Sequence, residues 1–275
     1  MAFKFIDLCA GIGGMRLAAE RNGGKCVLSS EIDAETAAAY RLNHGDEPVG
    51  DLMSLNPDAV PDSDMLLAGF PCQPFSKAGK LRGFADPRGT VFGGIMNVVR
   101  AKKPALVILE NVKNLSRHDG GATLETVMGS LADAGYAAAW KVLDARSFGL
   151  AQSRERTIIV ASLNGAFRFA KTDATAPPMS AILEDGGDFE FLGGGFTLIP
   201  KPAAQPKSGL IFAGYVNKNM RTDVDSPNPD ISRSHKQHNR VYSAAGSCPT
   251  IAAHEPTGRR WILLEDGRVR KLTLR

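Results

Sequence analysis

The 275-residue sequence contains only four cysteines and no long apolar run. The cysteines are scattered, without a Cys-x-x-Cys pair or a spacing typical of metal ligands, which argues against a zinc site and a disulfide framework. No stretch is long enough to span a membrane, and the first predicted strand follows Met1 too closely for a signal peptide. These absences predict a cytoplasmic protein without a bound metal ion or a membrane partner.

Acidic and basic residues are distributed unevenly along the chain. Residues 1–200 contain 20 Lys and Arg against 23 Asp and Glu, whereas residues 201–275 contain 13 against 6. A basic C-terminal part on a weakly acidic body favours a polyanionic partner such as nucleic acid. Solvated basic faces are common, so charge alone leaves this open.

Predicted strands alternate with predicted helices over the first 160 residues. We expect strands at residues 3–8, 25–30, 64–68, 105–110, 137–142 and 157–162, and helices at 15–21, 34–42, 90–101 and 123–134. The alternation predicts an α/β fold with a doubly wound, mainly parallel sheet. Near residue 165 the sequence becomes rich in Pro and Gly, then polar and basic. We therefore predict two domains, residues 1–168 around the sheet and residues 169–275 as a smaller, loop-rich domain.

The most unusual segment is Gly69–Ser76, with the sequence Gly-Phe-Pro-Cys-Gln-Pro-Phe-Ser, which directly follows a predicted buried strand. Its two prolines fix φ and remove backbone donors, so the loop can aim Cys72 outward from the carboxyl edge of the sheet. An isolated cysteine is more often a small buried apolar side chain. The segment alone therefore leaves a reactive and a packed cysteine open.

A glycine-rich turn, Asp7–Gly14, joins the first predicted strand to the first predicted helix, where a backbone without Cβ atoms can approach a ligand. The dinucleotide fingerprint is not met, because Arg16 takes the place of its third glycine. Glu31 and Asp33 end the second strand, where a carboxylate commonly binds ribose hydroxyls, and Asp51 adds a further acid. This pattern suits an adenosine cofactor without a pyrophosphate, such as S-adenosylmethionine. An ordinary capped turn is the alternative.

Over essentially the whole chain, the sequence resembles the DNA cytosine-5 methyltransferases, and its motifs follow one another in the order found in that family. The matching motifs are Asp7–Gly14, Glu31–Asp33, Gly50–Leu52, Gly69–Ser76, Glu110–Val112, Gln152–Arg156, Arg240–Ser243 and Cys248–Thr250. The resemblance implies a Rossmann-like domain that binds S-adenosylmethionine and a C-terminal target-recognition domain. It also implies base flipping in double-stranded DNA, a restriction–modification or phage system, and a cytoplasmic, nucleoid-associated enzyme.

The resemblance further implies roles for single residues. Cys72 would attack C6 of a flipped-out cytosine, Glu110 would protonate or hydrogen-bond N3, and Arg154 and Arg156, on one face of an extended segment, would favour the thiolate and hold the base or a carboxylate. The expected cofactor-binding residues are Asp7, Cys9, Gly11, Gly13, Gly14, Glu31, Ile32, Asp51, Leu52 and Pro71. The expected DNA contacts are Gln73, Ser76, Lys218, Arg221, Arg233, Lys236 and Arg240.

The sequence departs from the family pattern in two places. Cys9 stands where the family usually carries a phenylalanine that stacks on adenine, which predicts altered cofactor packing. After Lys271–Arg275 the helix and final motif of the family do not follow, which predicts weak cofactor binding and little turnover for residues 1–275 alone.

Three functions therefore stay open. The chain is an active DNA cytosine-5 methyltransferase, or a split subunit that binds DNA and needs a second polypeptide for the missing motif, or a transfer-RNA cytosine-5 methyltransferase. The Cys-Phe-Thr element of the transfer-RNA branch is not found here. The DNA recognition sequence is not indicated, because base readout depends on loop geometry.

Overall fold

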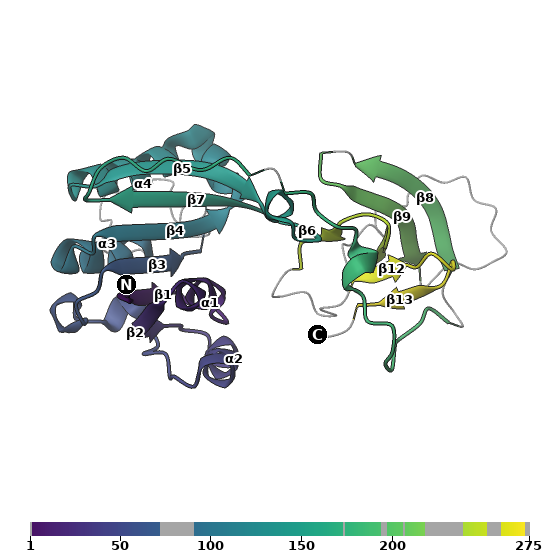
Figure 1. Ribbon diagram of the computed structural model, residues 1–275, viewed down its shortest axis with the longest axis horizontal. Coiled ribbons are helices and arrows are strands. Elements are labelled where there is room, and N and C mark those ends of the chain that lie inside the picture. Colours follow the sequence, from purple (N-terminus) through teal and green to yellow (C-terminus); the bar gives the residue numbers. More distant parts are fainter. Residues whose placement is uncertain are drawn as a thin grey trace. The chain divides into compact units, whose positions relative to one another are not determined.

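The computed structural model describes residues 2–71, 91–172, 174–193, 197–205, 207–217, 239–251 and 260–272. The chain forms two compact units (Figure 1). The first contains Met1–Leu143 and Glu155–Ala170, and the second contains Asp144–Arg154 and Lys171–Arg275, so the chain passes between them three times. The first domain predicted from the sequence, residues 1–168, includes residues 144–154. In the structure they bind the second unit, where Ala151 O accepts from Cys248 N at 2.7 Å.

The first unit is built on a six-stranded sheet with the strand order β2-β1-β3-β4-β7-β5. The strands are β1 (Phe3–Leu8), β2 (Gly24–Ser30), β3 (Met65–Gly69), β4 (Leu106–Val112), β5 (Ala137–Asp144) and β7 (Glu155–Ser162). The helices are α1 (Gly14–Arg21), α2 (Ala34–His44), α3 (Val91–Lys102) and α4 (Ala122–Asp133). Strands β2, β1, β3 and β4 are parallel, and β7 runs antiparallel to β4. The predicted mainly parallel α/β sheet is confirmed.

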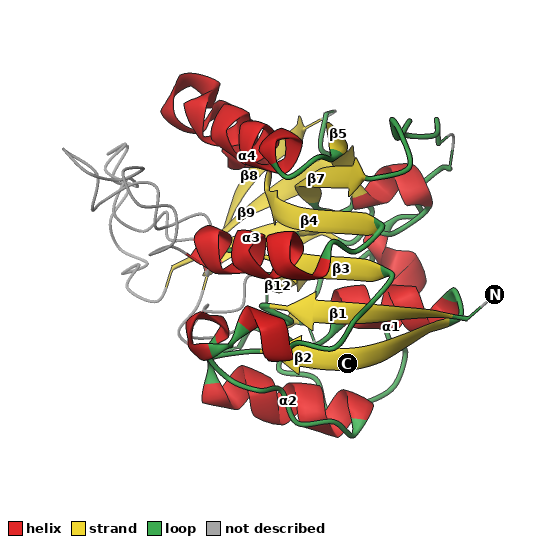
Figure 2. Ribbon diagram, turned by 90° about the vertical axis from the view of Figure 1, so that its left-hand side faces the viewer, coloured by secondary structure: helices red, strands yellow, loops and turns green. Residues whose placement is uncertain are grey.

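Helices cover both faces of this sheet (Figure 2). Ile6 and Leu8 of β1 belong to the large core cluster that also contains apolar side chains of α3 and α4. Phe5 of β1 instead packs with Ala19 of α1. Because successive side chains of a strand point to opposite faces, the two clusters lie on opposite sides of the sheet. The sheet is therefore doubly wound, as expected.

The second unit contains a five-stranded sheet with the order β13-β12-β10-β9-β8. Its strands are β8 (Thr197–Gln205), β9 (Leu210–Asn217), β10 (Arg240–Ser243), β12 (Trp261–Leu263) and β13 (Val269–Lys271), and a separate pair joins β6 (Gln152–Ser153) to β11 (Cys248–Pro249). The loop-rich domain predicted from the sequence therefore contains a sheet that the sequence did not indicate. Two prolines interrupt the strand pattern of β8, and they are tolerated because β8 is an edge strand with a register shift between Pro200 and Ala203.

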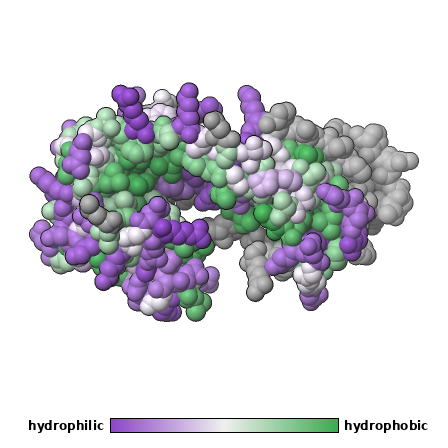
Figure 3. All heavy atoms as spheres, viewed as in Figure 1, coloured by the Kyte–Doolittle hydropathy of each residue, from purple (hydrophilic) through white to green (hydrophobic). Residues whose placement is uncertain are grey.

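Surface polarity differs across the first unit (Figure 3). On the face shown, apolar side chains gather in the upper part and hydrophilic side chains dominate below them. No helix in the described ranges is long and apolar enough to cross a bilayer.

Candidate functional site

A cavity of about 380 Å³ lies in the first unit, where β1, β2 and β3 end. Five segments line it: the glycine turn after β1, the end of β2, the Gly50–Leu52 segment, the end of β3 and Val91 at the start of α3. Of the expected cofactor-binding residues, those that line the cavity are Cys9, Gly11, Glu31, Ile32, Asp51, Leu52 and Pro71. Those that do not are Asp7, Gly13 and Gly14. The carboxyl ends of parallel strands thus bring together segments far apart in the sequence.

Two carboxylates are held in fixed orientations at the wall of this cavity. Glu31 Oε2 accepts from Gly11 N at 2.9 Å, and Oε1 accepts from Asp33 N at 2.9 Å, so Glu31 ties the end of β2 to the glycine turn. Asp51 Oδ1 accepts from Met53 N at 2.9 Å. Each carboxylate oxygen has more than one lone-pair site, so both acids can still accept hydrogen bonds from ligand hydroxyls.

Glycines keep the cavity open on the side of the turn. Gly11 has φ of 59° and Gly50 has φ of 76°, a left-handed conformation that costs glycine little. A Cβ atom added at either residue would meet no other atom within 4 Å. The space beside both backbones is therefore free for a ligand, as a nucleoside cofactor that packs on the turn requires.

Cys9 is a half-buried wall residue of the cavity and carries an unusual backbone φ of 52°. Burial and the nearby negative charges of Glu31, Asp7 and Asp51 raise the pKa of its thiol to about 12. The thiol is therefore neutral at physiological pH and acts as a packing group, because nucleophilic cysteines need a lowered pKa.

Asp7 lies inside the first unit and away from the cavity lining. It is 1% exposed, and neither of its carboxylate oxygens has a hydrogen-bond partner among the described residues. Burial raises the pKa of Asp7 to about 7, and the charge of Arg16 and the nearby Tyr40 hydroxyl offset only part of this rise. Asp7 thus lies buried at the start of the glycine turn and does not face the cavity.

Arg16 forms a buried polar cluster behind the same turn. Its Nε lies 2.7 Å from Glu20 Oε1, its Nη2 pairs with Asp46, and its Nη1 donates to the Tyr40 hydroxyl at 3.2 Å. From the sequence, Arg16 was notable only because it takes the place of the third glycine of the dinucleotide fingerprint. Its structural role could have been suspected from the Glu20 four residues later on the same helix face.

Gly13 is required by packing under the turn. A Cβ atom at Gly13 would lie 1.9 Å from His44 Nε2, so a larger residue would displace the buried ring of His44. Gly13 has φ of 88° and precedes α1 as its N-terminal cap. Gly13 therefore packs against His44 of α2, and the cofactor contact expected at Gly13 stays a prediction.

Glu110 lies at the end of β4, beside β3 on one side and β7 on the other. Its Oε1 is 2.8 Å from Arg156 Nε, and the two side chains are 26% and 19% exposed. A Cβ atom at Gly69 would be 3.6 Å from Cys9 O and 3.9 Å from Glu110 Oε2, so the glycine turn and Glu110 both approach the end of β3. Two of the four expected catalytic residues, Glu110 and Arg156, are thus brought together.

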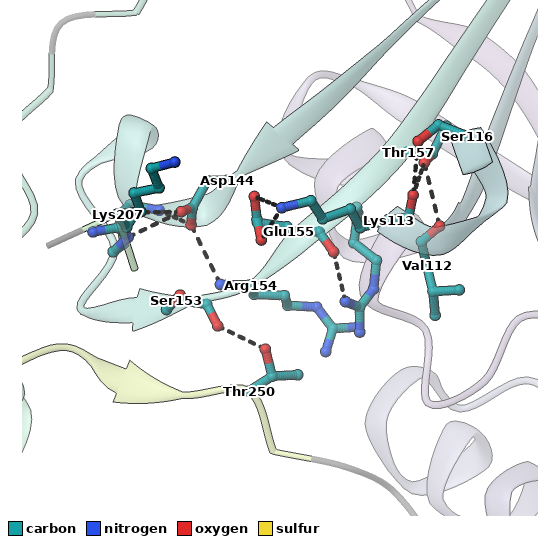
Figure 4. Close-up of polar contacts among 12 residues, drawn as sticks. Val112, Lys113, Ser116, Asp144, Ser153, Arg154, Glu155, Thr157, Lys207 and Thr250 are labelled. Atoms are coloured by element: carbon teal, nitrogen blue, oxygen red, sulfur yellow. Dashed lines mark hydrogen bonds and ion pairs between the residues drawn. The ribbon is translucent and has the colours of Figure 1, made fainter. Parts of the chain in front are cut away.

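Arg154 belongs to the second unit, whereas Arg156 belongs to the first. The Arg154 backbone N donates to Asp144 Oδ1 at 3.3 Å (Figure 4). On the other side of the crossing, Lys113 Nζ lies 2.6 Å from Glu155 Oε1 (Figure 4). The chain therefore passes between the units within the Gln152–Arg156 motif.

Asp144 organises the segment that enters the second unit. Its Oδ2 accepts from Arg146 Nε at 2.9 Å and from Arg146 Nη2 at 2.8 Å, and its Oδ1 accepts from Arg146 N at 3.1 Å. Burial raises the pKa of Asp144, but the hydrogen bonds and the charge of Arg146 outweigh it and hold the pKa below its ordinary value. Asp144 is therefore a fixed negative charge.

Asn111 follows Glu110 in β4 and belongs to the Glu110–Val112 motif, but the sequence indicated no role of its own for it. It is 2% exposed, its Nδ2 donates to Phe70 O at 2.9 Å, and its Oδ1 accepts from Val112 N at 2.8 Å. Only the tertiary structure reveals this contact, because Phe70 and Asn111 are 41 residues apart.

A second cavity, of about 560 Å³, lies within the second unit beside Arg146 and the 245–247 turn. Arg146 is neutralised there by Asp144, and the remaining described lining consists of Ala, Pro, Gly and Ser. This lining offers no acid, thiol or imidazole for chemistry, so the cavity of the first unit is the candidate site. No group of three or more His, Cys, Asp or Glu residues in the described ranges could hold a metal ion.

Several expected site residues fall outside the described residues, and they are Cys72, Gln73, Ser76, Lys218, Arg221, Arg233 and Lys236. Arg240 is described: it lies half-buried in β10, opposite Tyr215 of β9.

Comparisons with known proteins place these features in a family context. A family model for C-5 cytosine-specific DNA methylases matches residues 3–275. Type II methyltransferase M.NlaX of Neisseria lactamica is 49% identical over 187 residues, which are 66% of this chain and 60% of that protein. Type II methyltransferase M.HhaI of Haemophilus parahaemolyticus is 47% identical over 161 residues, which are 58% of this chain and 49% of that protein. The matches thus span about half to three fifths of these relatives.

Solved structures share the fold at lower identity. A protein described as a prophage DNA modification methyltransferase of E. coli gives a TM-score of 0.60 at 16% identity and covers 90% of this chain and 82% of its own. A DNMT2 mutant of Spodoptera frugiperda gives 0.56 at 23% identity and covers 67% and 60%. At these identities the likeness is evidence for the fold.

Proposed function

Because the chain belongs to the C-5 cytosine-specific DNA methylase family, we propose that it transfers a methyl group from S-adenosylmethionine to C5 of cytosine in a specific double-stranded DNA sequence. The observation that carries this proposal is the meeting of the cavity, Glu110 and the segment leading into Cys72 at one edge of the sheet. The names of the type II relatives favour a restriction–modification or phage system.

The cavity fits the nucleoside part of S-adenosylmethionine. Glu31 and Asp51 would accept hydrogen bonds from the ribose hydroxyls, and Ile32, Leu52 and Val91 would pack against the adenine. The cofactor would approach the backbone at Gly11, where no Cβ fills the space. When bound, S-adenosylmethionine supplies an electrophilic methyl group on a sulfonium sulfur.

Cytosine C5 is a weak nucleophile, and the proposed chemistry activates it through the neighbouring carbon. Cys72, which directly follows Pro71 in the sequence, adds as a thiolate to C6, and the electrons of the C5–C6 bond make C5 nucleophilic. Glu110 holds or delivers a proton at N3, which takes up the negative charge of the ring. After methylation a base removes the C5 proton and Cys72 leaves as the thiolate.

Arg156 orients Glu110 for this task through the 2.8 Å ion pair, and Arg154 follows the motif pattern as a second cation. The second unit would act as the target-recognition domain, and its net positive sequence suits the DNA backbone. The target base has to leave the stack, at a cost of roughly a few kcal/mol that protein–DNA contacts must offset. Arg240 and the expected contacts outside the described residues are the candidates.

Neither alternative function gains independent support. The likeness to DNMT2 is below 25% identity and concerns the fold, so a transfer-RNA substrate is kept as an outcome of the experiment. The relatives reported above give no support to a second polypeptide. The same assays, made with this chain alone, decide both points.

The test supplies labelled S-adenosylmethionine with mixed-sequence duplex DNA or with transfer RNA, followed by bisulfite sequencing of the DNA. We expect label in DNA, at the cytosine of one sequence. Duplex DNA with 5-fluorocytosine at that position should trap a covalent complex, since fluorine cannot leave as a proton, and Cys72→Ser should abolish trapping. Label in transfer RNA only, or trapping by the Cys72→Ser variant, would refute the proposal.

A further inference from the structure

We propose that Asn111 is a positioning residue that fixes the Phe70 carbonyl and thereby sets the start of the Pro71–Cys72 segment relative to Glu110. This inference rests on the proposed function, because Cys72 and Glu110 are the two groups whose relative placement it controls.

The backbone hydrogen-bond ladder between β3 and β4 ends just before Phe70 and Pro71, the residues that lead to Cys72. The last pair of residues in register is Gly69 with Glu110, so Phe70 has no partner in that ladder. The side chain of Asn111, the next residue of β4, supplies the following link through its 2.9 Å bond to Phe70 O. Asn111 thus extends the connection between the strands by one residue, into the chain that leads to Cys72.

The bond from Asn111 to Phe70 O is important for the orientation of the Phe70–Pro71 peptide plane. Proline has no backbone N–H, so the Phe70 carbonyl is the one hydrogen-bonding group of that peptide unit. This carbonyl oxygen accepts a hydrogen bond from Asn111 Nδ2 at a site where Asn111 is 2% exposed and Phe70 is 3% exposed. The orientation of this peptide plane therefore depends on the amide of Asn111.

The amide itself is held in one orientation. Asn111 Oδ1 accepts from Val112 N at 2.8 Å, and a nitrogen in that position would face another donor. The Phe70 ring is anchored separately, with its centre 5.5 Å from that of Phe92. Side chain and carbonyl of Phe70 are thus fixed by independent contacts, and removing Asn111 releases the carbonyl alone.

Neighbouring residues of β4 therefore place the two reacting groups. Glu110 is oriented by Arg156 of β7, and Asn111 orients the end of β3. A small displacement between a nucleophile and an acid is costly, because a misplacement of about 1 Å can slow a reaction roughly 10²-fold. The rate of attack by Cys72 should therefore depend on Asn111, which acts in this proposal through its bond to Phe70 O.

The test compares Asn111→Asp with Thr157→Val as a matched control. Asn111→Asp keeps the acceptor for Val112 N and loses the donor for Phe70 O. Thr157 is 0% exposed and donates to Val112 O at 3.2 Å, so Thr157→Val removes a buried bond from the same strand end without touching Phe70 (Figure 4). Asn111→Ser is a second variant for the case in which Asn111→Asp does not fold, as judged by thermal melting and near-UV circular dichroism.

The readouts are single-turnover methyl transfer, the rate of covalent trapping on 5-fluorocytosine DNA, and separate affinities for S-adenosylmethionine and DNA. For Asn111→Asp we expect both rates to fall roughly 10- to 100-fold, with both affinities and KM changed less than about threefold. For Thr157→Val we expect a lower melting temperature and rates within about threefold of wild type. A wild-type rate in the Asn111 variants, or an equal loss in Thr157→Val, would overturn the inference.

The same experiment separates this inference from its premise. If the wild-type chain neither methylates nor traps DNA, the proposed function fails and the inference falls with it. If the wild type does both and the Asn111 variants match it, the proposed function stands and Asn111 has no positioning role.

Discussion

Two aspartates near strand ends, one in each unit, have opposite electrostatic surroundings. Asp7 of β1 is 1% exposed and has no hydrogen-bond partner among the described residues, and its pKa rises to about 7. Asp144 at the end of β5 has a side chain that is 16% exposed and accepts bonds from Arg146 and Arg154, and its pKa lies below the ordinary value. Burial raises the pKa of both carboxyls, but Asp7 is buried more deeply and Asp144 accepts more hydrogen bonds, so the two pKa values move in opposite directions.

The comparison separates two uses of a carboxylate. Asp144 is ionised, and its hydrogen bonds from Arg146 and from the Arg154 backbone N hold this segment in place, as is typical of a carboxylate with several donors. Asp7 sits behind the glycine turn at the boundary between its neutral and charged forms near neutral pH. The glycine turn of the first unit is thus expected to respond to pH near neutrality, whereas the Asp144–Arg146 contacts of the second unit are not.

The largest expected effect concerns a third carboxylate, Glu110, which has a guanidinium partner as Asp144 does but is proposed to handle a proton. Glu110→Gln keeps the shape and removes the titrating group. Methyl transfer should fall by roughly 10²–10⁴, the usual range for a lost general acid, with little change in DNA binding. Glu155→Gln is the control, because its partner Lys113 is 46% exposed and the pair lies on the surface. A parallel loss of DNA affinity would show that Glu110 is a DNA contact or a structural residue.

The next effect concerns the pH dependence of stability through Asp7. A raised native pKa means that the stabilising contribution is complete below about pH 4, declines as the pH rises, and is lost above about 7. At about 1.4 kcal/mol per pKa unit, the decline amounts to roughly 4 kcal/mol between these limits. Asp7→Asn should remove it, so the free energies of unfolding of the two proteins should diverge with rising pH. Urea denaturation from pH 4 to 8 measures this, and parallel curves would contradict it.

Asp144→Asn should have the opposite sign. A lowered native pKa contributes stability that is present above the ordinary carboxylate pKa and is lost as the pH falls through the native value. Replacing the carboxylate weakens charge-assisted bonds to Arg146, each worth about 1.5–3 kcal/mol, so stability at pH 7 should fall by about that amount. If Asp144→Asn and Asp7→Asn change the unfolding free energy at pH 8 in the same direction, the comparison fails.

The smallest effect should come from Lys113→Ala. Lys113 and Glu155 pair on the surface, with side chains 46% and 41% exposed. Exposed pairs of this kind contribute about 0–1 kcal/mol, and salt screens them. Thermal melting at low and high salt should show a change near the limit of detection. A loss of stability comparable to that of Asp144→Asn would mean that solvent exposure does not explain the difference between the Lys113–Glu155 and Asp144–Arg146 pairs.

The sequence predicted the parts of the site that local patterns encode. Strand ends, the glycine turn and the acids at Glu31, Asp51 and Glu110 follow from hydrophobic runs bounded by glycine and carboxylates, and the cavity and strand ends are where these patterns place them. Features that depend on distant partners were not visible. The bond from Asn111 to Phe70 arises only when separate segments pack together, and so does the burial of the Asp7 carboxylate without a hydrogen-bond partner among the described residues.

The second unit shows the same limit at the level of strands. The segment that forms β10 is short, β9 and β10 lie beside polar and basic sequence, and β8 contains prolines, so periodicity alone did not reveal them. β8 and β9 are consecutive strands that pair with each other, but β10 pairs with β9 and β12, which lie farther away in the sequence. Each strand is stabilised by such neighbours, which periodicity does not reveal. The roles expected for Cys72 and the DNA contacts outside the described residues stay predictions.

The position of β7 also has a consequence for the order in which the chain can fold during synthesis. In the described sheet β7 lies between β4 and β5, although it is made after both, and the residues between β5 and β7 belong to the second unit. β5 therefore leaves the ribosome before the strand that joins it to the sheet, with Trp140 on a strand whose edges are unpaired. Until Ser162 has emerged, this edge can pair with another chain, so slow translation or a destabilised β7 favours aggregation over assembly.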